Sequence, residues 1–239
     1  MTTSASTPMS WVMPYGQLAW VQQLSPQVAR KFFNTPNSFV VGGSAIPGLN
    51  ATVLPLFTSL HDYHNAGSSM TGANFPWVCF DIENWAKSVE IEKRHVKLAL
   101  YAFADLAHAR GQKLVAAPSR DIIYAKAADV PWQWPETIDA GYLRIGIPLA
   151  CNDADVFLCQ SQGDTPNPAT FASLIQQADQ QTAPNQTFWA ELSTNNVTGA
   201  QMKAAYDAAM TSGAIIQGWW VAIPAQSQAQ VAVDFFNML

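Results

Sequence analysis

The segment 77–117 decides the fold, and it reads WVCFDIENWAKSVEIEKRHVKLALYAFADLAHARGQKLVAA. Its first seven residues alternate apolar with other side chains, at the period of two that is typical of a strand. Residues 88–110 carry the apolar spacing of a helix, and we expect Ser88 to cap its start and Gly111 to follow its end. Residues 113–117 begin a second strand. This order predicts two parallel strands joined by a right-handed helical crossover.

The same alternation of short apolar runs and longer helical patterns extends over the rest of the chain. We expect further strands at 11–15, 39–43, 156–162, 187–193 and 215–222, and helices at 50–64, 136–152, 168–181, 198–212 and 226–238. Residues 142–148 are a candidate eighth strand, although Gly141, Gly146 and Pro148 allow a helix as well. The pattern predicts an α/β protein with a single TIM-barrel domain of the (β/α)8 type over residues 1–239. A distorted or seven-stranded barrel is the first alternative, and an open doubly wound sheet is the second.

The composition limits the classes of function. The 239 residues are 49% hydrophobic and only 12% charged, and they carry a net charge of −5. The 12 Lys and Arg residues form no basic run, so a nucleic-acid partner is not expected. No run of about 18 apolar residues occurs, so no membrane span is expected. The first ten residues lack the basic and apolar regions of a signal peptide, which predicts a cytoplasmic protein, or a secreted one whose signal has been removed.

Cofactor motifs are missing from the sequence as well. The three cysteines, Cys79, Cys151 and Cys159, are irregularly spaced, which argues against a disulfide framework. Neither a G-x-G-x-x-G nor a Walker sequence is present, and no ligand spacing typical of zinc occurs. We therefore expect no cofactor and no metal, with a divalent cation held by acidic side chains as the less favoured alternative. The expected assembly is a monomer or a homodimer.

The main catalytic candidates lie at the end of the strand expected at 77–83. If its apolar residues at 78, 80 and 82 face the helices, Cys79, Asp81 and Glu83 point into the barrel. Functional groups of such barrels lie at the carboxyl ends of the strands. Two carboxyl groups this close push one pKa upward, which keeps a general acid protonated near neutral pH. The alternative is a structural role, in which these carboxylates pair with Arg120.

Further candidates follow other strand ends. Glu191 is expected to point inward from the strand at 187–193, as a third catalytic carboxylate. Gln160 and Gln162 face the mouth if residues 156 and 158 fill the inner layer, and otherwise Ser161 does. The remaining substrate-binding candidates at the rim are Trp85, Ser119, Arg120, Trp219 and Trp220, and one ring of the last two is expected to form the floor of the pocket.

The aromatic content indicates the kind of ligand. The chain has 9 Trp, and seven lie at expected strand ends or in loops: Trp77, Trp85, Trp132, Trp134, Trp189, Trp219 and Trp220. Flat aromatic faces among amides and carboxylates suit a neutral polyhydroxylated ligand, and equally a flat hydrophobic natural product. A phosphorylated ligand is not favoured, because Arg120 is the only evident cation at the rim and no glycine-rich anion cradle occurs.

The strand end Phe80-Asp81-Ile82-Glu83 resembles the catalytic strand of family-18 chitinases and related endoglycosidases. That family carries two spaced aspartates, one further residue and a glutamate. Asp81 and Glu83 match, whereas Cys79 stands at the earlier acidic position. The resemblance implies that Glu83 is the general acid, that Asp81 orients a substrate amide and that Trp219 or Trp220 stacks on a sugar.

The resemblance covers only the short motif. In the family it lies on the fourth strand, whereas here it lies on the third strand that we expect. The segment 81–121 also resembles uncharacterised bacterial barrel proteins with an Asp-x-Glu-x-Trp strand, which implies the fold and no activity.

Three functions compete at this point. The first is a glycoside hydrolase-like enzyme in which paired carboxylates act as general acid and base on a carbohydrate. The second is a cyclase, isomerase or lyase that uses the same carboxylates on a small hydrophobic natural product, for which an enclosed pocket is expected. The third is a barrel that binds a ligand without catalysis, for which Arg120 or backbone donors must occupy both Asp81 and Glu83.

Overall fold

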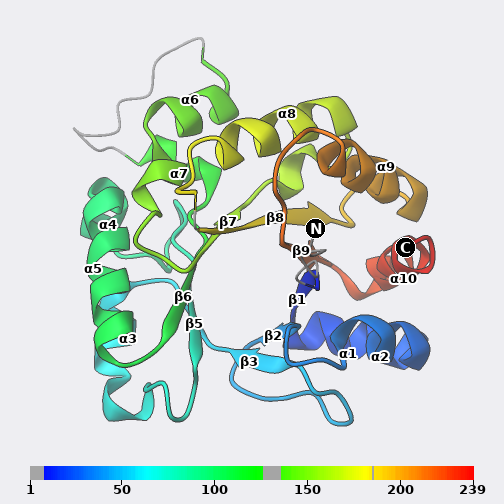
Figure 1. Cartoon of the computed structure of the whole chain (residues 1–239), viewed down its shortest axis with the longest axis horizontal. Helices are drawn as coiled ribbons and strands as arrows, with labels where there is room; N and C mark the ends of the chain where they lie inside the picture. The colour runs from blue at the N-terminus through cyan, green and yellow to red at the C-terminus, as the bar shows by residue number, and fades with distance from the viewer. Residues whose placement is uncertain (1–7, 126–135, 185) are drawn as a thin grey trace, which may run out of the picture.

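The structure is a computed structural model, and it describes residues 8–125, 136–184 and 186–239, so that Trp132 and Trp134 lie outside the described residues. All strand pairs are parallel, and the strands follow the order β3-β2-β1-β9-β8-β7-β6-β5-β4. Figure 1 shows the strands in the middle of the molecule with helices around them. The chain therefore has the predicted α/β fold of the TIM-barrel type. The strands are β1 (Ser10–Pro14), β2 (Phe39–Val41), β3 (Thr52–Leu54), β4 (Leu56–Phe57), β5 (Trp77–Phe80), β6 (Lys113–Ala116), β7 (Val156–Cys159), β8 (Thr187–Ser193) and β9 (Gly218–Ala222).

Residues 52–57 connect the two ends of this sheet. β3 pairs with β2, while β4, which begins two residues after β3 ends, pairs with β5. Pro55 lies between them and has no N–H to donate, but its carbonyl accepts a hydrogen bond from the Cys79 N–H at 2.8 Å. The nine strands thus occupy eight positions around the ring, and β5 is the fourth of them.

Of the two alternatives left open for residues 142–148, the structure shows the helical one. Residues 142–148 lie in α6 (Ile138–Arg144) and α7 (Ile147–Ala150), and Gly146 takes a left-handed φ of 70° between the two helices. The segment 52–57 fills the eighth position instead, in a range for which we expected a helix. Only α3 (Leu60–Asn65) is helical there. Pro55 accounts for the difference, because a proline in the middle of a helix removes a hydrogen bond and clashes with the preceding turn.

The helix expected at 88–110 is interrupted. It consists of α4 (Glu90–Arg94) and α5 (Val96–Ala109), with His95 at φ −122° between them. Ser88 does not cap it. Its hydroxyl accepts hydrogen bonds from the Glu83 N–H at 3.2 Å and from the Trp85 indole at 3.0 Å, and so orders the loop after β5.

Three further helices lie close to their expected ranges: α8 (Pro168–Asp179), α9 (Gly199–Met210) and α10 (Ala229–Asn237). The sequence analysis missed α1 (Tyr15–Leu24) and α2 (Pro26–Phe33), which follow β1. Short 3₁₀ turns are η1 (Gly67–Ser69), η2 (Arg120–Tyr124), η3 (Gln162–Asp164) and η4 (Gln226–Gln228). Among the described residues, no helix has the length and apolar character needed to cross a membrane.

Two apolar layers lie on the two sides of the strands. The side chains at 78, 80 and 82 belong to the outer layer, between the ring and the helices. Cys79, Leu158 and Trp189 belong to the inner layer inside the barrel. The Trp189 indole lies against Gly218, where an added Cβ would come within 2.4 Å of the ring. The predicted alternation of inward and outward side chains is therefore confirmed at β5 and β8.

Candidate active site

The carboxyl ends of the strands position two of the predicted carboxyl groups. β5 ends at Phe80, and the Asp81 N–H still donates to the Phe57 carbonyl at 2.8 Å, so Asp81 continues the strand direction toward the mouth. Two hydrogen bonds fix the backbone of the turn that follows Asp81. Ser119 N–H donates to the Ile82 carbonyl at 2.9 Å, and the Glu83 N–H donates to Ser88 Oγ. Glu83 therefore stands on an ordered loop directly above Asp81.

A cavity of about 180 Å³ lies at this mouth. It brings together six of the predicted site residues, and no Lys, Arg or His is among the described residues that line it. The predicted residues in its wall are Asp81, Glu83, Gln160, Gln162, Glu191 and Trp220, and the others are Pro14, Gln17, Ala117, Leu158 and Ala222.

Gln17 is the polar residue of this wall that the sequence analysis missed. It lies in the first turn of α1, immediately after β1, and its Oε1 accepts a hydrogen bond from the Ile223 N–H at 2.7 Å. The signal that could have found it is its position, because the carboxyl end of β1 opens to the same mouth as those of β5 and β8.

Burial and mutual repulsion raise the pKa of all three carboxyl groups. Burial, and next the charge of Glu83, raise the pKa of Asp81 to about 8. Burial, and next the charge of Asp121, raise the pKa of Glu83. Burial, followed by the charges of Asp81 and Glu83, raises the pKa of Glu191 well above its usual range. The site therefore holds protons at neutral pH that exposed carboxyl groups would have released.

Asp81 and Glu83 lie in the same wall of the cavity, two residues apart in the chain. The charge of Glu83 adds to burial in raising the pKa of Asp81. The two carboxyl groups are therefore close enough to repel each other when both are ionised.

The amide of Gln160 holds the Asp81 side chain in place. Gln160 Nε2 donates to the Ala117 carbonyl at 2.9 Å and to Asp81 Oδ1 at 2.6 Å. A backbone carbonyl can only accept, so the amide orientation is determined by this contact. Asp81 Oδ1 therefore accepts a hydrogen bond from this amide.

Residues of β7 and the turn after it support the opposite wall. Val156 and Leu158 fill the inner layer, so Gln160 and Gln162 face the mouth, which resolves the two alternatives left open by the sequence. Ser161 lies behind them. Its Oγ donates to the Glu191 carbonyl at 2.8 Å and accepts from the Glu191 N–H at 3.2 Å, which fixes the backbone that carries this carboxyl.

Arg120 and Trp219 lie away from the cavity. The Arg120 guanidinium is buried and forms ion pairs with Asp139 and Asp164, not with Asp81 or Glu83. Trp219 belongs to the outer layer, where it packs against aromatic rings of α8 and α9, and Trp220 is the ring that lines the cavity.

Ser119 and Trp85 are also outside the wall of the cavity. Ser119 Oγ accepts a hydrogen bond from the Asp121 N–H at 3.4 Å and so caps η2. The Trp85 indole N–H donates to Ser88, and its ring lies 4.7 Å from the Lys87 ammonium group. Both residues order the loops around the mouth.

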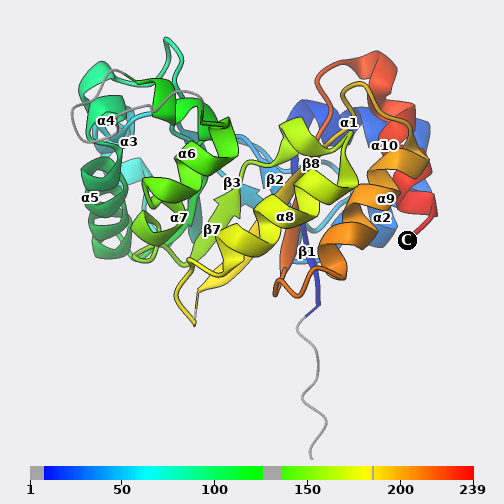
Figure 2. The same ribbon diagram turned by 90° about the horizontal axis from the view of Figure 1, so that it is seen from above.

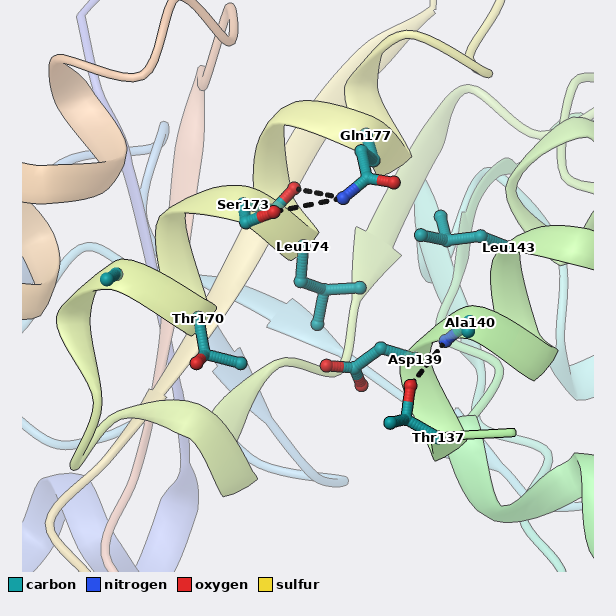
Figure 3. A pocket seen from close by; sticks show the side chains of 9 residues that line it. Thr137, Asp139, Ala140, Leu143, Thr170, Ser173, Leu174 and Gln177 are labelled. Carbon is teal, nitrogen blue, oxygen red and sulfur yellow. Dashed lines mark hydrogen bonds between the residues drawn. The ribbon is translucent and has the colours of Figure 1, made fainter. Parts of the chain in front are cut away.

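A larger cavity of about 450 Å³ lies outside the barrel, between α6 and α8 (Figure 3). Two of its polar side chains already have partners within the protein. The Asp139 carboxylate pairs with Arg120, and the Gln177 amide donates to the Ser173 carbonyl and hydroxyl on the same helix. The mouth cavity, with its coupled carboxyl groups, is therefore the candidate active site.

Comparisons with known proteins show the fold. No family model matches the chain, and neither does any curated protein. The carboxyl transferase domain of Rhizobium etli pyruvate carboxylase is similar, with a TM-score of 0.55 and 10% sequence identity over 97% of this chain and 47% of that chain. A variant of that domain with pyruvate gives a TM-score of 0.53 and 11% identity over 97% of this chain and 48% of that chain.

The chain thus spans about half the length of these domain structures. A structure of Rhizobium etli pyruvate carboxylase crystallised without acetyl coenzyme A gives a TM-score of 0.53 and 10% identity, over 98% of this chain and 28% of that chain. At this level of identity the likeness concerns the barrel fold alone.

Proposed function

We propose that this chain is a glycoside hydrolase-like enzyme that performs general acid/base chemistry on a small, neutral, hydroxylated substrate. The observation that carries the proposal is one cavity whose wall holds Asp81, Glu83 and Glu191, with no Lys, Arg or His among the described residues that line it. Glycosidic bond cleavage needs a carboxyl group that is protonated near neutral pH and a second carboxyl group in reach of the same bond.

The two carboxyl groups take different roles in this proposal. Glu83 stands nearer the mouth and protonates the leaving oxygen, in agreement with its role in the family that the motif resembles. Asp81 lies two residues before it in the same wall and, in line with the same resemblance, orients the substrate. Glu191 is the second carboxyl group, because it lies in the same wall on a different strand.

The cavity wall supports a neutral and compact substrate. About 180 Å³ is less than the roughly 300–1,000 Å³ of pockets for drug-sized ligands, and equals the volume of about six water molecules in the liquid. Three glutamine amides and the Trp220 ring offer hydrogen bonds and a flat apolar face. A single sugar-sized ring fits this description better than a phosphorylated molecule, which needs a cation in the wall.

Strand order adds support to the resemblance. Residues 52–57 make β5 the fourth strand position of the ring, and the fourth strand carries the motif in family-18 enzymes. One difference from the family-18 motif remains. Cys79, which is buried in the inner layer, stands where that motif has its first aspartate.

The small cavity also favours a second candidate, an isomerase or lyase that transfers protons with the same carboxyl groups. For this second candidate we propose a polar substrate, because residues with carboxyl or amide groups make up about half of the cavity wall. The third reading, a binding barrel, required Arg120 or backbone donors to occupy both Asp81 and Glu83. Arg120 does not meet this condition, because it pairs with Asp139 and Asp164.

Hydrolysis of a panel of 4-nitrophenyl glycosides tests the proposal, with release of nitrophenol as the readout. We expect turnover of at least one glycoside, and a rate that falls as the pH rises through about 8, because Asp81 and Glu83 are then both ionised and no proton is left for the leaving oxygen. Glu83→Gln is expected to lower kcat by about 10²–10⁴-fold. The matched control is Glu90→Gln on the exposed α4, which leaves kcat unchanged.

A second measurement separates the two candidates. The corresponding free sugars are incubated in D₂O and followed by NMR. The isomerase or lyase is favoured over the hydrolase if wild type hydrolyses no glycoside but incorporates deuterium, and if Glu83→Gln abolishes that incorporation. Full hydrolytic activity in Glu83→Gln contradicts the proposed acid.

A further inference from the structure

A second feature of the molecule lies outside the barrel, on the outer face of α4 and α5. Ile91, Leu98 and Tyr101 are 61%, 66% and 57% exposed, so three large apolar side chains face outward on adjacent helices. Ile91 and Leu98 line a groove of about 340 Å³ whose remaining apolar wall is Leu60, Ala99 and Ala102, and Tyr101 lies three residues after Leu98 on α5. Apolar residues in such a cluster, unlike scattered ones, mark an interaction site.

This face lies at the edge of the molecule. In both Figure 1 and Figure 2, α5 is at the outer left, with the barrel strands on its inner side. The inner side of α5 is fully used, because Leu100, Phe103 and Ala107 are buried in the outer layer of the core. The exposed apolar side chains therefore do not serve the packing of α5 on its own barrel.

The charges around the cluster have a symmetric arrangement. Lys97 lies four residues before Tyr101 and Asp105 lies four residues after it, and all three are exposed on α5. Neither Lys97 nor Asp105 has a hydrogen bond or ion pair with the residues that the structure describes. By contrast, the neighbouring Glu90 on α4 is paired with Lys93 and Arg94.

We propose that this face binds a second copy of the chain, with the two α5 helices packed antiparallel about a two-fold axis level with Tyr101. The helical rise of about 1.5 Å per residue places Lys97 and Asp105 about 6 Å on either side of that axis. Antiparallel packing then sets Lys97 of each copy level with Asp105 of the other, across the usual interhelical distance of about 8–10 Å. The two ion pairs flank the apolar contact of Tyr101 and Leu98.

A two-fold interface of this kind is self-complementary, because each copy supplies both members of the charge pair. A different protein partner would need its own matching pair of opposite charges at the same spacing. The interface is independent of the proposed chemistry, because α5 lies outside the barrel and the catalytic candidates lie at its mouth.

Sedimentation equilibrium over a range of protein concentrations tests the proposal. The wild-type chain is expected to pass from a species of 26.0 kDa to one of twice that mass as the concentration rises. Either Lys97→Glu or Asp105→Lys turns both ion pairs of the dimer into pairs of like charges. Each variant is therefore expected to raise the dimer Kd at least about tenfold. The double variant restores opposite charges and is expected to return within about threefold of the wild-type Kd.

The control is Ile215→Glu, at an apolar side chain that is 71% exposed elsewhere on the surface, and it leaves the Kd unchanged. All substituted side chains are exposed, and circular dichroism verifies that each variant is folded. A wild-type chain that stays monomeric at about 0.5 mM overturns the proposal. So does a double variant that stays as dissociated as the single ones, or an equal loss in Ile215→Glu.

Discussion

At the scale of single residues, the position of Asp81 sets the chemistry of the mouth. It lies one residue beyond the end of a buried strand, where the ladder still fixes its backbone but the side chain has left the apolar layer. Its Oδ1 accepts a hydrogen bond from the Gln160 amide at 2.6 Å, while burial, and next the charge of Glu83, raise its pKa to about 8. Because burial favours the protonated form of Asp81, the free energy of unfolding is expected to fall at high pH, where this carboxyl group ionises.

Asp81→Asn tests this expectation. The pKa of Asp81 is about 8 in the folded chain and about 3.9 in an unfolded one, so the folded chain binds the extra proton between these values. The free energy of unfolding therefore falls as the pH rises from about 4 to about 8. Asparagine has no proton to lose, so we expect Asp81→Asn to be more stable than wild type at pH 8, on the order of 2 kcal/mol.

Urea unfolding at pH 5 and pH 8 measures this difference, and the exposed Asp153→Asn serves as the control. An equal fall with pH in Asp81→Asn and in the wild type contradicts the raised pKa.

At the scale of elements, Arg120 joins three segments behind the mouth. It begins η2 after β6, and its guanidinium bonds Asp139 of α6 and Asp164 of η3. Gly163 leaves room for it, since a Cβ there would come within 2.7 Å of the guanidinium. The turn that carries Gln162 therefore depends on a cation that does not itself enter the cavity.

Arg120→Met is expected to destabilise the chain by about 3–5 kcal/mol, because it leaves two partly buried carboxylates without their shared cation. Thermal or urea unfolding measures the loss. Lys203→Met on α9 is the matched control, since the Lys203–Asp207 pair is largely exposed and contributes about 0.5 kcal/mol or less. An equal decrease in the free energy of unfolding in the two variants would contradict the prediction, because Arg120 would then contribute no more than an exposed ion pair does.

At the scale of the whole molecule, the two ends of the chain close the barrel together. β1 pairs with β9, and the helices on either side of this seam meet in an aromatic cluster. The Phe236 ring of α10 lies 5.1 Å from Trp11 and 4.6 Å from Phe32, as measured between ring centroids. This seam joins residues more than 200 positions apart, so the ring is complete only when both ends are in place.

Phe236→Ala is expected to lower the free energy of unfolding by about 3–5 kcal/mol, because it opens a cavity among rings that cannot collapse into it. Urea denaturation followed by far-UV circular dichroism measures the change. Met238→Ala, two residues later and 45% exposed, is expected to cost less than about 1 kcal/mol. A loss of under 1 kcal/mol in Phe236→Ala would show that the ends of the chain do not support the barrel.

Local patterns in the sequence determined the strand–helix order from β5 to α10 and the inward direction of Asp81, Glu83 and Glu191. These follow from the period of two along a strand, which depends only on neighbouring residues. Whether Gln160 and Gln162 or instead Ser161 face the mouth depends on whether residues 156 and 158 point into the barrel. The local sequence does not determine that direction.

The tertiary structure decided what depends on distant partners. Residues 52–57 form a strand because β2 and β5 lie on either side of them, and Pro55 interrupts the helical alternative. Arg120 turns to Asp139 and Asp164, and Trp219 faces outward while Trp220 lines the cavity, because β9 takes its register from β1 and β8. The sequence by itself determined which side chains share one face of a strand, since that is local geometry. Only the closed ring determined which of them meet, since those contacts join residues far apart in the chain.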